Sequence, residues 1–240
     1  MLPMNSLKDV DTLLFDMDGT LTNLWKRYRD PFLKALDKIK PDYDREKVHE
    51  VFESVLTDVL TTSEGSSRLL KVKLFLKSRK EMGGSWLDTF RVMKLVFSDP
   101  LSFREIVPLD GVQSTLEILQ SRGYKLALVT SAGDKTVNKA IEKLKILESF
   151  DVLVTRNTVK RIKPYPDSLL FACNYLGKDP SNSAMIGDFP QDVKAGKNAG
   201  TKTIAILGDN GKYTEEEIRS LNPDIVLESF PELLELFPQL

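Results

Sequence analysis

The strongest indication of the fold comes from "TLLFDMDGTL", residues 12–21. The run opens with mostly apolar residues, which is typical of a strand buried on both faces of a parallel sheet. It then passes directly into Asp16, Asp18 and Gly19. Ligands of parallel sheets bind beyond the carboxyl ends of the strands, so both carboxylates are expected at a ligand site. The glycine permits a sharp turn and a close approach of the backbone there.

Short apolar runs of the same kind recur along the chain and are predicted to be strands. With the first, they cover residues 12–16, 125–130, 151–155, 183–188, 202–207 and 224–227. Patterns with helical spacing, most of them followed by a glycine, cover Val112–Ser121, Lys135–Leu147, Asp167–Leu176 and Pro190–Ala199. Strands that alternate with helices in this way predict an α/β fold, a parallel sheet covered by helices on both faces.

One interval departs from this alternation. A strand–helix–strand crossover needs only about 30 residues, but the first two predicted strands are much farther apart. Strand patterns are not convincing there, and helix-start signals occur instead at Asp30-Pro31, Asp44 and Ser85. Such a long helical insertion is large enough to be a module of its own. We therefore predict a core formed by residues 1–22 and 108–240 and a helical insertion formed by residues 23–107.

The composition is that of an ordinary globular protein, with 41% hydrophobic and 29% charged residues. The formal net charge is −1 and long blocks of like charge are absent, so binding to nucleic acid or to a membrane surface gains no support. The single cysteine, Cys173, cannot form an intramolecular disulfide and is predicted to be a small core residue. Neither a secretory signal nor a membrane-spanning stretch is recognisable, which makes the cytoplasm the default location.

Polar residues also follow other predicted strands. Thr130 and Ser131 follow the second strand, Asp188 ends the fourth, and Asp192 comes four residues later. Lys163 lies in "RIKPYPD", just before the helix that precedes the fourth strand. Each of these residues by itself is explained equally well as the cap of a turn or a helix.

Together, these residues indicate more than capping. Four carboxylates at one edge of a sheet would raise each other's pKa unless cations shared the site. Lys163 supplies one positive charge, and a hard divalent ion with oxygen ligands, for which we expect Mg²⁺, supplies the rest. Asp16, Asp18 and Asp188 are the predicted metal ligands, with Asp192 behind them or acting through water. This combination predicts phosphoryl transfer.

The residue types also indicate a mechanism. An ionised Asp16 is a nucleophile at neutral pH without an activating base, and its attack on phosphorus gives an aspartyl phosphate that water can hydrolyse. Asp18 can protonate the departing oxygen and then deprotonate the attacking water. Thr130 or Ser131 can donate its hydroxyl and backbone N–H to the phosphoryl oxygens, and Lys163 can neutralise developing charge. The predicted catalytic residues are Asp16, Asp18, Thr130 and Lys163, and the predicted substrate-binding residues are Gly19, Thr130, Ser131, Ala132 and Lys163.

Four motifs in this order resemble those of the haloacid-dehalogenase-like hydrolase superfamily: "DMDGTL" (16–21), "VTS" (129–131), "IKPYPD" (162–167) and "GDFPQD" (187–192). The resemblance implies a Rossmann-like core, an aspartyl-phosphate intermediate, Mg²⁺, and a mobile cap inserted after the first motif. A helical insertion at residues 23–107 is similar to the caps of the branch that includes phosphoglycolate phosphatases, pyrophosphatases and sugar-phosphate mutases. Dehalogenase members lack the second aspartate of the first motif, so Asp18 argues against dehalogenation.

The leading hypothesis is a Mg²⁺-dependent phosphatase that acts on a small phosphorylated metabolite, as a monomer or homodimer. A phosphomutase or a pyrophosphatase of the same superfamily is the alternative, because the core motifs do not separate them. A binding protein that has lost turnover is a third interpretation, against which the complete motifs argue. The polar loop "TTSEGSSR" (61–68), with Glu64, Ser66, Ser67 and Arg68, is either a specificity loop or a solvated turn between helices.

Overall fold

The computed structural model describes residues 7–39, 42–44, 46–47, 50–51, 54, 85–98, 106–208 and 211–240. The chain forms two compact units. The core unit consists of Met1–Asn23 and Pro108–Leu240, and the inserted unit consists of Leu24–Val107. The loop 61–68, and most of the helices expected after Asp44, lie outside the described residues.

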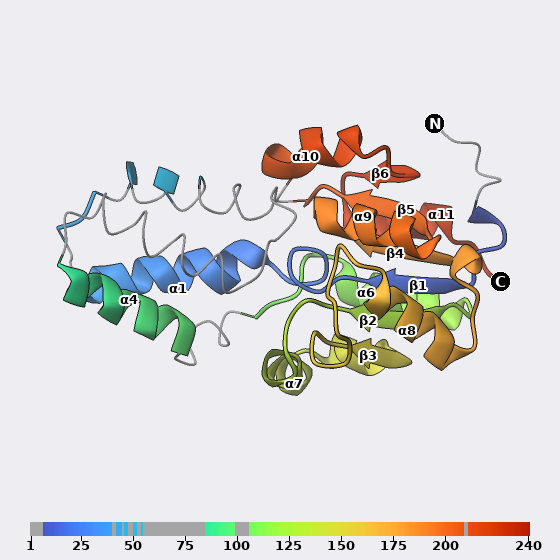
Figure 1. The fold of residues 1–240 in the computed structure, drawn as a ribbon, viewed down its shortest axis with the longest axis horizontal. Coiled ribbons are helices and arrows are strands. Elements are labelled where there is room, and N and C mark those ends of the chain that lie inside the picture. The colour runs from blue at the N-terminus through green and yellow to red at the C-terminus, as the bar shows by residue number, and fades with distance from the viewer. Residues whose placement is uncertain are drawn as a thin grey trace. The chain divides into compact units, whose positions relative to one another are not determined.

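The core unit is built on a parallel sheet. The described residues form six strands in it: β1 (Thr12–Phe15), β2 (Lys125–Val129), β3 (Val152–Val154), β4 (Ser183–Gly187), β5 (Lys202–Ile206) and β6 (Ile225–Leu227). Their order is β3-β2-β1-β4-β5-β6, and each neighbouring pair is parallel (Figure 1). This is the strand order of a Rossmann-like fold. All six strands predicted from the sequence are confirmed.

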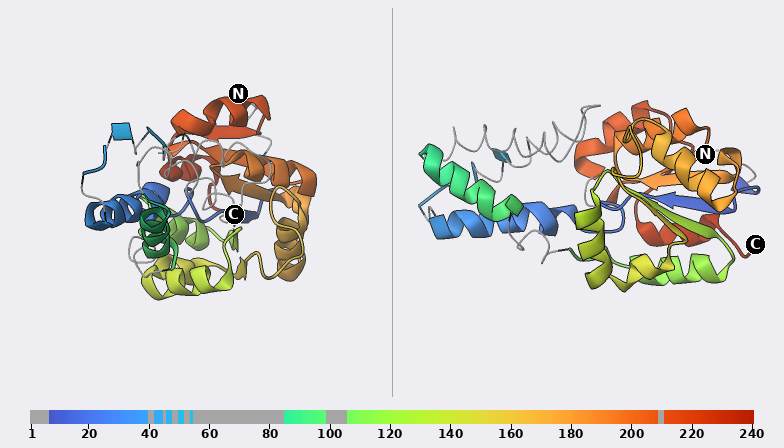
Figure 2. Two further views of the ribbon diagram at one scale, coloured as in Figure 1. Left: turned by 60° about the vertical axis from the view of Figure 1, so that its left-hand side comes forward. Right: turned by 60° about the horizontal axis from the view of Figure 1, so that its bottom comes forward.

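Helices cover both faces of this sheet. In the core unit they are α6 (Val112–Ser121), α7 (Asp134–Lys143), α8 (Asp167–Leu176), α9 (Pro190–Ala199), α10 (Gly211–Ser220) and the short α11 (Leu233–Leu236). Short 3-10 helices lie at Lys145–Ser149, Pro180–Asn182 and Phe230–Glu232. In the right-hand view of Figure 2, the sheet lies between α8 and α9, in orange, and α6, in green. The three-layer α/β arrangement is therefore confirmed.

The helices α6, α8 and α9 have the predicted bounds, but α7 does not. The periodicity predicts a helix as far as Leu147, whereas α7 ends at Lys143 and a 3-10 helix follows. Leu144, between them, has an extended backbone with φ −112° and ψ 101°. Leu144 and Ile146 are both buried. The packing of these two side chains, rather than helical periodicity, sets the backbone here.

In the inserted unit, α1 (Leu24–Ile39) packs against α4 (Trp86–Ser98). The helix start predicted at Asp30-Pro31 is wrong, because α1 begins at Leu24 and Pro31 lies inside it. A proline inside a helix removes one backbone hydrogen bond. The buried face of α1 runs past the proline, from Leu24 to Leu36, so side-chain packing outweighs that loss. The start predicted at Ser85 is confirmed, since Ser85 Oγ accepts a hydrogen bond from the backbone N–H of Asp88 (3.2 Å).

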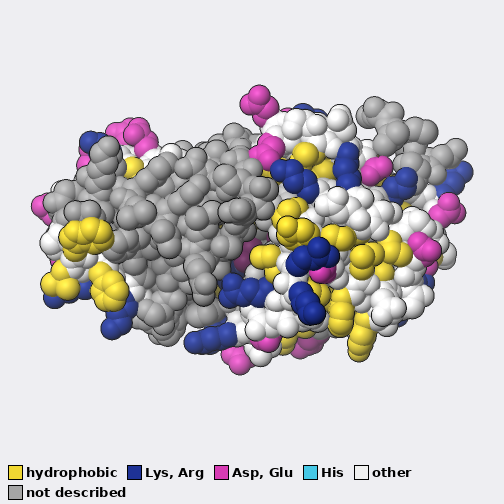
Figure 3. Space-filling model, viewed as in Figure 1, with side chains coloured by type: hydrophobic (Ala, Val, Ile, Leu, Met, Phe, Trp, Pro, Cys, Tyr) yellow, Lys and Arg dark blue, Asp and Glu magenta, His cyan; other side chains and the backbone are white. Residues whose placement is uncertain are grey.

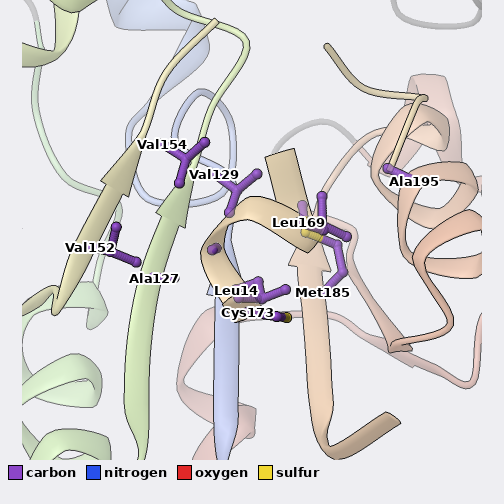
Figure 4. Packing of buried hydrophobic residues seen from close by; sticks show 10 residues of the cluster. Leu14, Ala127, Val129, Val152, Val154, Leu169, Cys173, Met185 and Ala195 are labelled. Atoms are coloured by element: carbon purple, nitrogen blue, oxygen red, sulfur yellow. The ribbon is translucent and has the colours of Figure 1, made fainter. Parts of the chain in front are cut away.

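The apolar core of the core unit occupies both faces of the sheet. On one face, Leu14 of β1 belongs to a cluster with Leu169 and Cys173 of α8 (Figure 4). The next residue, Phe15, points to the opposite face. There the centroid of its ring lies 5.7 Å from the centroid of the Phe230 ring. Cys173 is 1% exposed, as predicted for a small core residue. A strand covered on both faces needs apolar side chains at successive positions, which explains the continuous run in β1.

Large hydrophobic side chains are exposed on the loop before α8 and along its outer face (Figure 3): Tyr165, Leu170, Phe171 and Tyr175. The rings of Phe171 and Tyr175 are stacked, with centroids 6.4 Å apart. The guanidinium of Arg161 lies 4.8 Å from the centroid of the Tyr165 ring. These contacts shelter part of the apolar surface from water. Among the described residues, no helix is long and apolar enough to span a membrane.

Candidate active site

Two aspartates follow directly on neighbouring central strands. Asp16 comes after β1 and Asp188 after β4, and these strands are paired with Phe15 opposite Ile186. The backbone N–H of Asp16 continues the ladder by donating to the Ile186 carbonyl (3.0 Å). In this strand order the winding of the chain reverses between β1 and β4, which is where α/β sheets bind ligands. The sheet thus brings both carboxylates to its ligand edge.

Lys163 joins the first of these aspartates to a third one. Its Nζ donates to Asp16 Oδ1 (2.5 Å) and to Asp192 Oδ1 (2.6 Å). Lys163 lies in the loop between β3 and α8, with a cis peptide bond to Pro164. Asp192 belongs to the first turn of α9. Lys163, Asp16 and Asp192 are 5%, 4% and 2% exposed, so the three charges meet away from solvent.

Burial and charge oppose one another in this cluster. Burial disfavours the ammonium form of Lys163, but the carboxylates of Asp16 and Asp192 outweigh it, and the pKa of Lys163 lies above its ordinary value. Burial is the main cause that raises the pKa of Asp192 to about 6, with Asp16 adding to it and Lys163 opposing it. At neutral pH Lys163 is therefore charged.

The aspartate cluster has the composition of a metal site. Asp16, Asp188 and Asp192 are buried, and each offers a carboxylate oxygen within 4.8 Å of the others. One ammonium offsets only one of these charges, and buried charges need partners. Carboxylate oxygens suit a hard divalent ion. The donor set therefore fits Mg²⁺, although Asp18, a predicted ligand, is not a member of this group.

Asp192 is fixed by more than its bond to Lys163. Its Oδ2 accepts a hydrogen bond from the backbone N–H of Phe189 (3.0 Å), while Oδ1 accepts from Lys163. A side-chain carbon at Gly187 would overlap the Asp192 carboxylate. The glycine at the end of β4 is therefore needed for the close approach of α9 to the strand.

The first motif forms a tight turn after β1. Gly19 has a φ of 101°, in the left-handed region, and its N–H donates to the Thr22 carbonyl (2.9 Å). The Thr20 hydroxyl donates to Asp188 Oδ1 (2.6 Å), and the Thr22 hydroxyl donates to Asp18 Oδ1 (3.3 Å). Sequence reasoning assigned no role to Thr20 or Thr22. The signal available was a pair of hydroxyl residues directly after an acidic turn.

The second predicted motif, "VTS" (129–131), begins at the last residue of β2. The backbone N–H of Thr130 donates to the Val154 carbonyl (2.9 Å), and Thr130 Oγ1 accepts from the N–H of Ala132 (3.0 Å). Of the two backbone N–H groups predicted as alternative donors to a phosphoryl oxygen, that of Thr130 is therefore used by the sheet, and that of Ser131 stays a prediction. The hydroxyl protons of Thr130 and Ser131 stay the predicted donors of this loop.

The family model of the haloacid dehalogenase-like hydrolases matches residues 13–206. This span contains all four motifs and the inserted residues between them. The chain belongs to the haloacid dehalogenase-like hydrolases. The resemblance inferred from the sequence is thus confirmed, and with it the interpretation of the protein as a hydrolase.

Similar proteins in this family span the whole chain. It is 32% identical over 229 residues to the pyrophosphatase PpaX of Halalkalibacterium halodurans, covering 95% of this chain and 97% of that protein. A predicted phosphoglycolate phosphatase from Haemophilus somnus is 20% identical with a TM-score of 0.74, over 97% of this chain and 100% of that one. A candidate β-phosphoglucomutase from Thermotoga maritima is 22% identical with a TM-score of 0.72, over 95% and 98%. These two structures show that the fold is shared.

Proposed function

We propose that this haloacid dehalogenase-like hydrolase is a Mg²⁺-dependent phosphatase that cleaves a small phosphorylated metabolite, in the manner of a phosphoglycolate phosphatase. The observation that carries the proposal is the Lys163 ammonium, 2.5 Å from Asp16 Oδ1 inside a buried carboxylate cluster. It pairs with the Asp16 carboxylate and stands beside the place where a phosphoryl group would arrive. A fixed cation there stabilises charge that develops during transfer without reorganising water.

In the first chemical step, an oxygen of Asp16 attacks the phosphorus of the substrate. A new bond forms between that oxygen and phosphorus, and the bond from phosphorus to the leaving oxygen breaks. The leaving oxygen keeps the electron pair of the broken bond and takes a proton from Asp18. General acid help of this kind is worth about 10²–10⁴-fold. The products are an alcohol and an aspartyl phosphate at residue 16.

In the second step, water attacks the phosphorus of the aspartyl phosphate. The carboxylate of Asp18 takes a proton from the water, the bond between phosphorus and the Asp16 oxygen breaks, and inorganic phosphate leaves. Asp16 is a carboxylate again and Asp18 is protonated for the next cycle. Lys163 is bound to both Asp16 and Asp192 and so keeps its position through both steps.

The predicted metal is consistent with the carboxylates present. Oxygens of Asp16, Asp188 and Asp192 would hold Mg²⁺, whose charge would offset that of the phosphoryl group. Thr20 donates to Asp188 Oδ1, which orients that carboxylate. Because Asp192 also accepts a hydrogen bond from Lys163, it would hold the ion and the ammonium group side by side. We place the enzyme in the cytoplasm, as a monomer or homodimer.

A second candidate function is hydrolysis of inorganic pyrophosphate. The observation that favours it is the 32% identity, over nearly the whole chain, to a protein named as the pyrophosphatase PpaX. The same residues can perform both reactions, because only the leaving group changes from an alcohol to phosphate. The choice between the two depends on what surrounds the leaving group, and not on the aspartate cluster.

The proposal is tested by phosphate release from a panel of phosphorylated metabolites that includes inorganic pyrophosphate. The blank is Asp16→Asn, which replaces the nucleophile by a neutral amide of nearly the same shape. We expect release by the wild type and none by the blank. Turnover of Asp16→Asn near the wild-type rate would show that the mechanism is wrong. Isomerised sugar phosphate without released phosphate would identify a mutase instead.

A further inference from the structure

Thr22 lies where the core unit is interrupted by the inserted residues. It is 1% exposed and forms one backbone bridge with Asp18 and another with Pro108, the first residue of the returning chain. Its carbonyl accepts a hydrogen bond from the N–H of Gly19 (2.9 Å). A β-branched side chain on a backbone held from both directions has little rotational freedom. The Thr22 hydroxyl is therefore a fixed group.

This hydroxyl is directed at the turn that carries Asp18. Thr22 Oγ1 is within donor distance of the Met17 carbonyl (3.1 Å) and of Asp18 Oδ1 (3.3 Å). A hydroxyl has one proton to donate, so the two acceptors share it. When Oδ1 accepts the hydrogen bond from the hydroxyl, it has no proton of its own. The acidic proton of the Asp18 carboxyl group is then carried by Oδ2.

We propose that Thr22 is a positioning residue for proton transfer by Asp18. The proposal rests on the phosphatase mechanism above, in which Asp18 protonates the leaving oxygen while the bond to phosphorus breaks. Thr22 acts through Asp18 and not on the reacting atoms. Its contact with Oδ1 makes Oδ2 the oxygen that carries the acidic proton to the leaving group. A misplacement of about 1 Å of a catalytic group can cost about 10²-fold in rate.

If Thr22 assists proton donation, its effect on the rate should depend on the basicity of the leaving group. A leaving group that is stable as an anion needs little help from an acid, whereas a more basic one depends on it. Phenyl phosphate and 4-nitrophenyl phosphate have similar shapes, but phenol is much the weaker acid. The ratio of kcat/KM for these two probes reports proton donation in the step that forms the aspartyl phosphate. A loss of folded protein or of metal lowers both values together.

The test compares Thr22→Val, which removes the hydroxyl and keeps the branched shape, with Thr22→Ser, which keeps the hydroxyl. For Thr22→Val we expect kcat/KM to fall about 10-fold or more with phenyl phosphate and less than about threefold with 4-nitrophenyl phosphate. Thr22→Ser should keep the wild-type ratio. The matched control is Thr203→Val, because buried Thr203 also donates to a carboxylate, Asp224 Oδ2 (2.7 Å), but at the amino end of β5. It should leave the ratio unchanged.

Equal losses on both probes, or no loss, in Thr22→Val overturn the proposal. If Thr22→Val does not fold, Thr22→Ala against Thr22→Ser gives the same comparison, and equal ratios in those two variants overturn it. The phosphatase proposal is judged separately by Asp16→Asn with the same probes. If the wild type cleaves them and Asp16→Asn does not, the phosphatase proposal stands whatever Thr22 does. If the wild type releases phosphate neither from these probes nor from any member of the metabolite panel, both proposals fail.

Discussion

Replacing Lys163 by methionine should strongly destabilise the core unit. The Lys163 side chain is 4% exposed and lies 2.5 Å and 2.6 Å from carboxylates that are 6% and 3% exposed. Methionine has a similar length but no charge, so Lys163→Met leaves these carboxylates buried without their counter-ion. Removing one partner of a buried ion pair costs about 3–5 kcal/mol. The whole free energy of unfolding of a domain is only about 5–15 kcal/mol.

The surface pair of Lys178 and Asp11 provides a matched control. Its separation of 2.6 Å is nearly the same, but the two side chains are 29% and 32% exposed. Exposed pairs contribute about 0–1 kcal/mol, so Lys178→Met should cost at most that much. The assay is urea unfolding in chelator, followed by far-UV circular dichroism. Tryptophan fluorescence is unsuitable because both tryptophans, Trp25 and Trp86, lie in the inserted unit.

The loss in Lys163→Met should also depend on pH. Burial already raises the pKa of Asp192 to about 6, and without Lys163 it should rise further. A carboxyl group with a raised pKa in the folded state binds its proton more tightly there, so folding becomes less favourable as the pH rises through that pKa. The deficit should therefore be larger at about pH 8 than at about pH 5. A deficit no larger than that of Lys178→Met, or one independent of pH, would refute this reasoning.

Three further predictions concern the metal, the glycine at β4 and the inserted unit. Chelation should stop phosphate release, Mg²⁺ should restore it better than Ca²⁺, and Asp188→Ala should raise the Mg²⁺ concentration needed; full activity in excess chelator would contradict the assignment. Gly187→Ala places a carbon against the Asp192 carboxylate, so phosphate release should fall at least about 10-fold, and unchanged kinetics would contradict the close packing. Arg68→Ala should cost about 1–3 kcal/mol in kcat/KM on natural substrates but little on aryl phosphates; equal losses on both would show that the loop supports folding instead.

Much of the fold could be predicted from the sequence because most strands are apolar runs followed by a polar residue, as β1 is by Asp16 and β4 by Asp188. Parallel topology then places those polar ends together, which is why Asp16 and Asp188 could be expected at one edge. The same reasoning failed for α1, where a local signal, Asp30-Pro31, was outweighed by a buried face that extends beyond it. Local propensity is a weak guide wherever tertiary packing decides.

The arrangement inside the site was less accessible from the sequence. The contact of Lys163 with Asp192 depends on how a loop and the first turn of α9 approach each other, and no periodicity encodes that distance. Thr22 was missed because its backbone is held by a bridge to Pro108, far along the chain. Sequence spacing predicts which ends of the strands and helices lie near one another. The hydrogen bonds between side chains of different elements come only from the packed structure.

The central claim is that Asp16 carries the phosphoryl group during turnover. The most direct measurement is mass spectrometry of the peptide containing residue 16, after acid quench of the enzyme during steady-state turnover of 4-nitrophenyl phosphate. The account predicts a fraction of that peptide heavier by one phosphoryl group, and borohydride should reduce the acyl phosphate at residue 16 to homoserine. Rapid turnover with no phosphoryl group on Asp16, or with the group on another residue, would contradict the account.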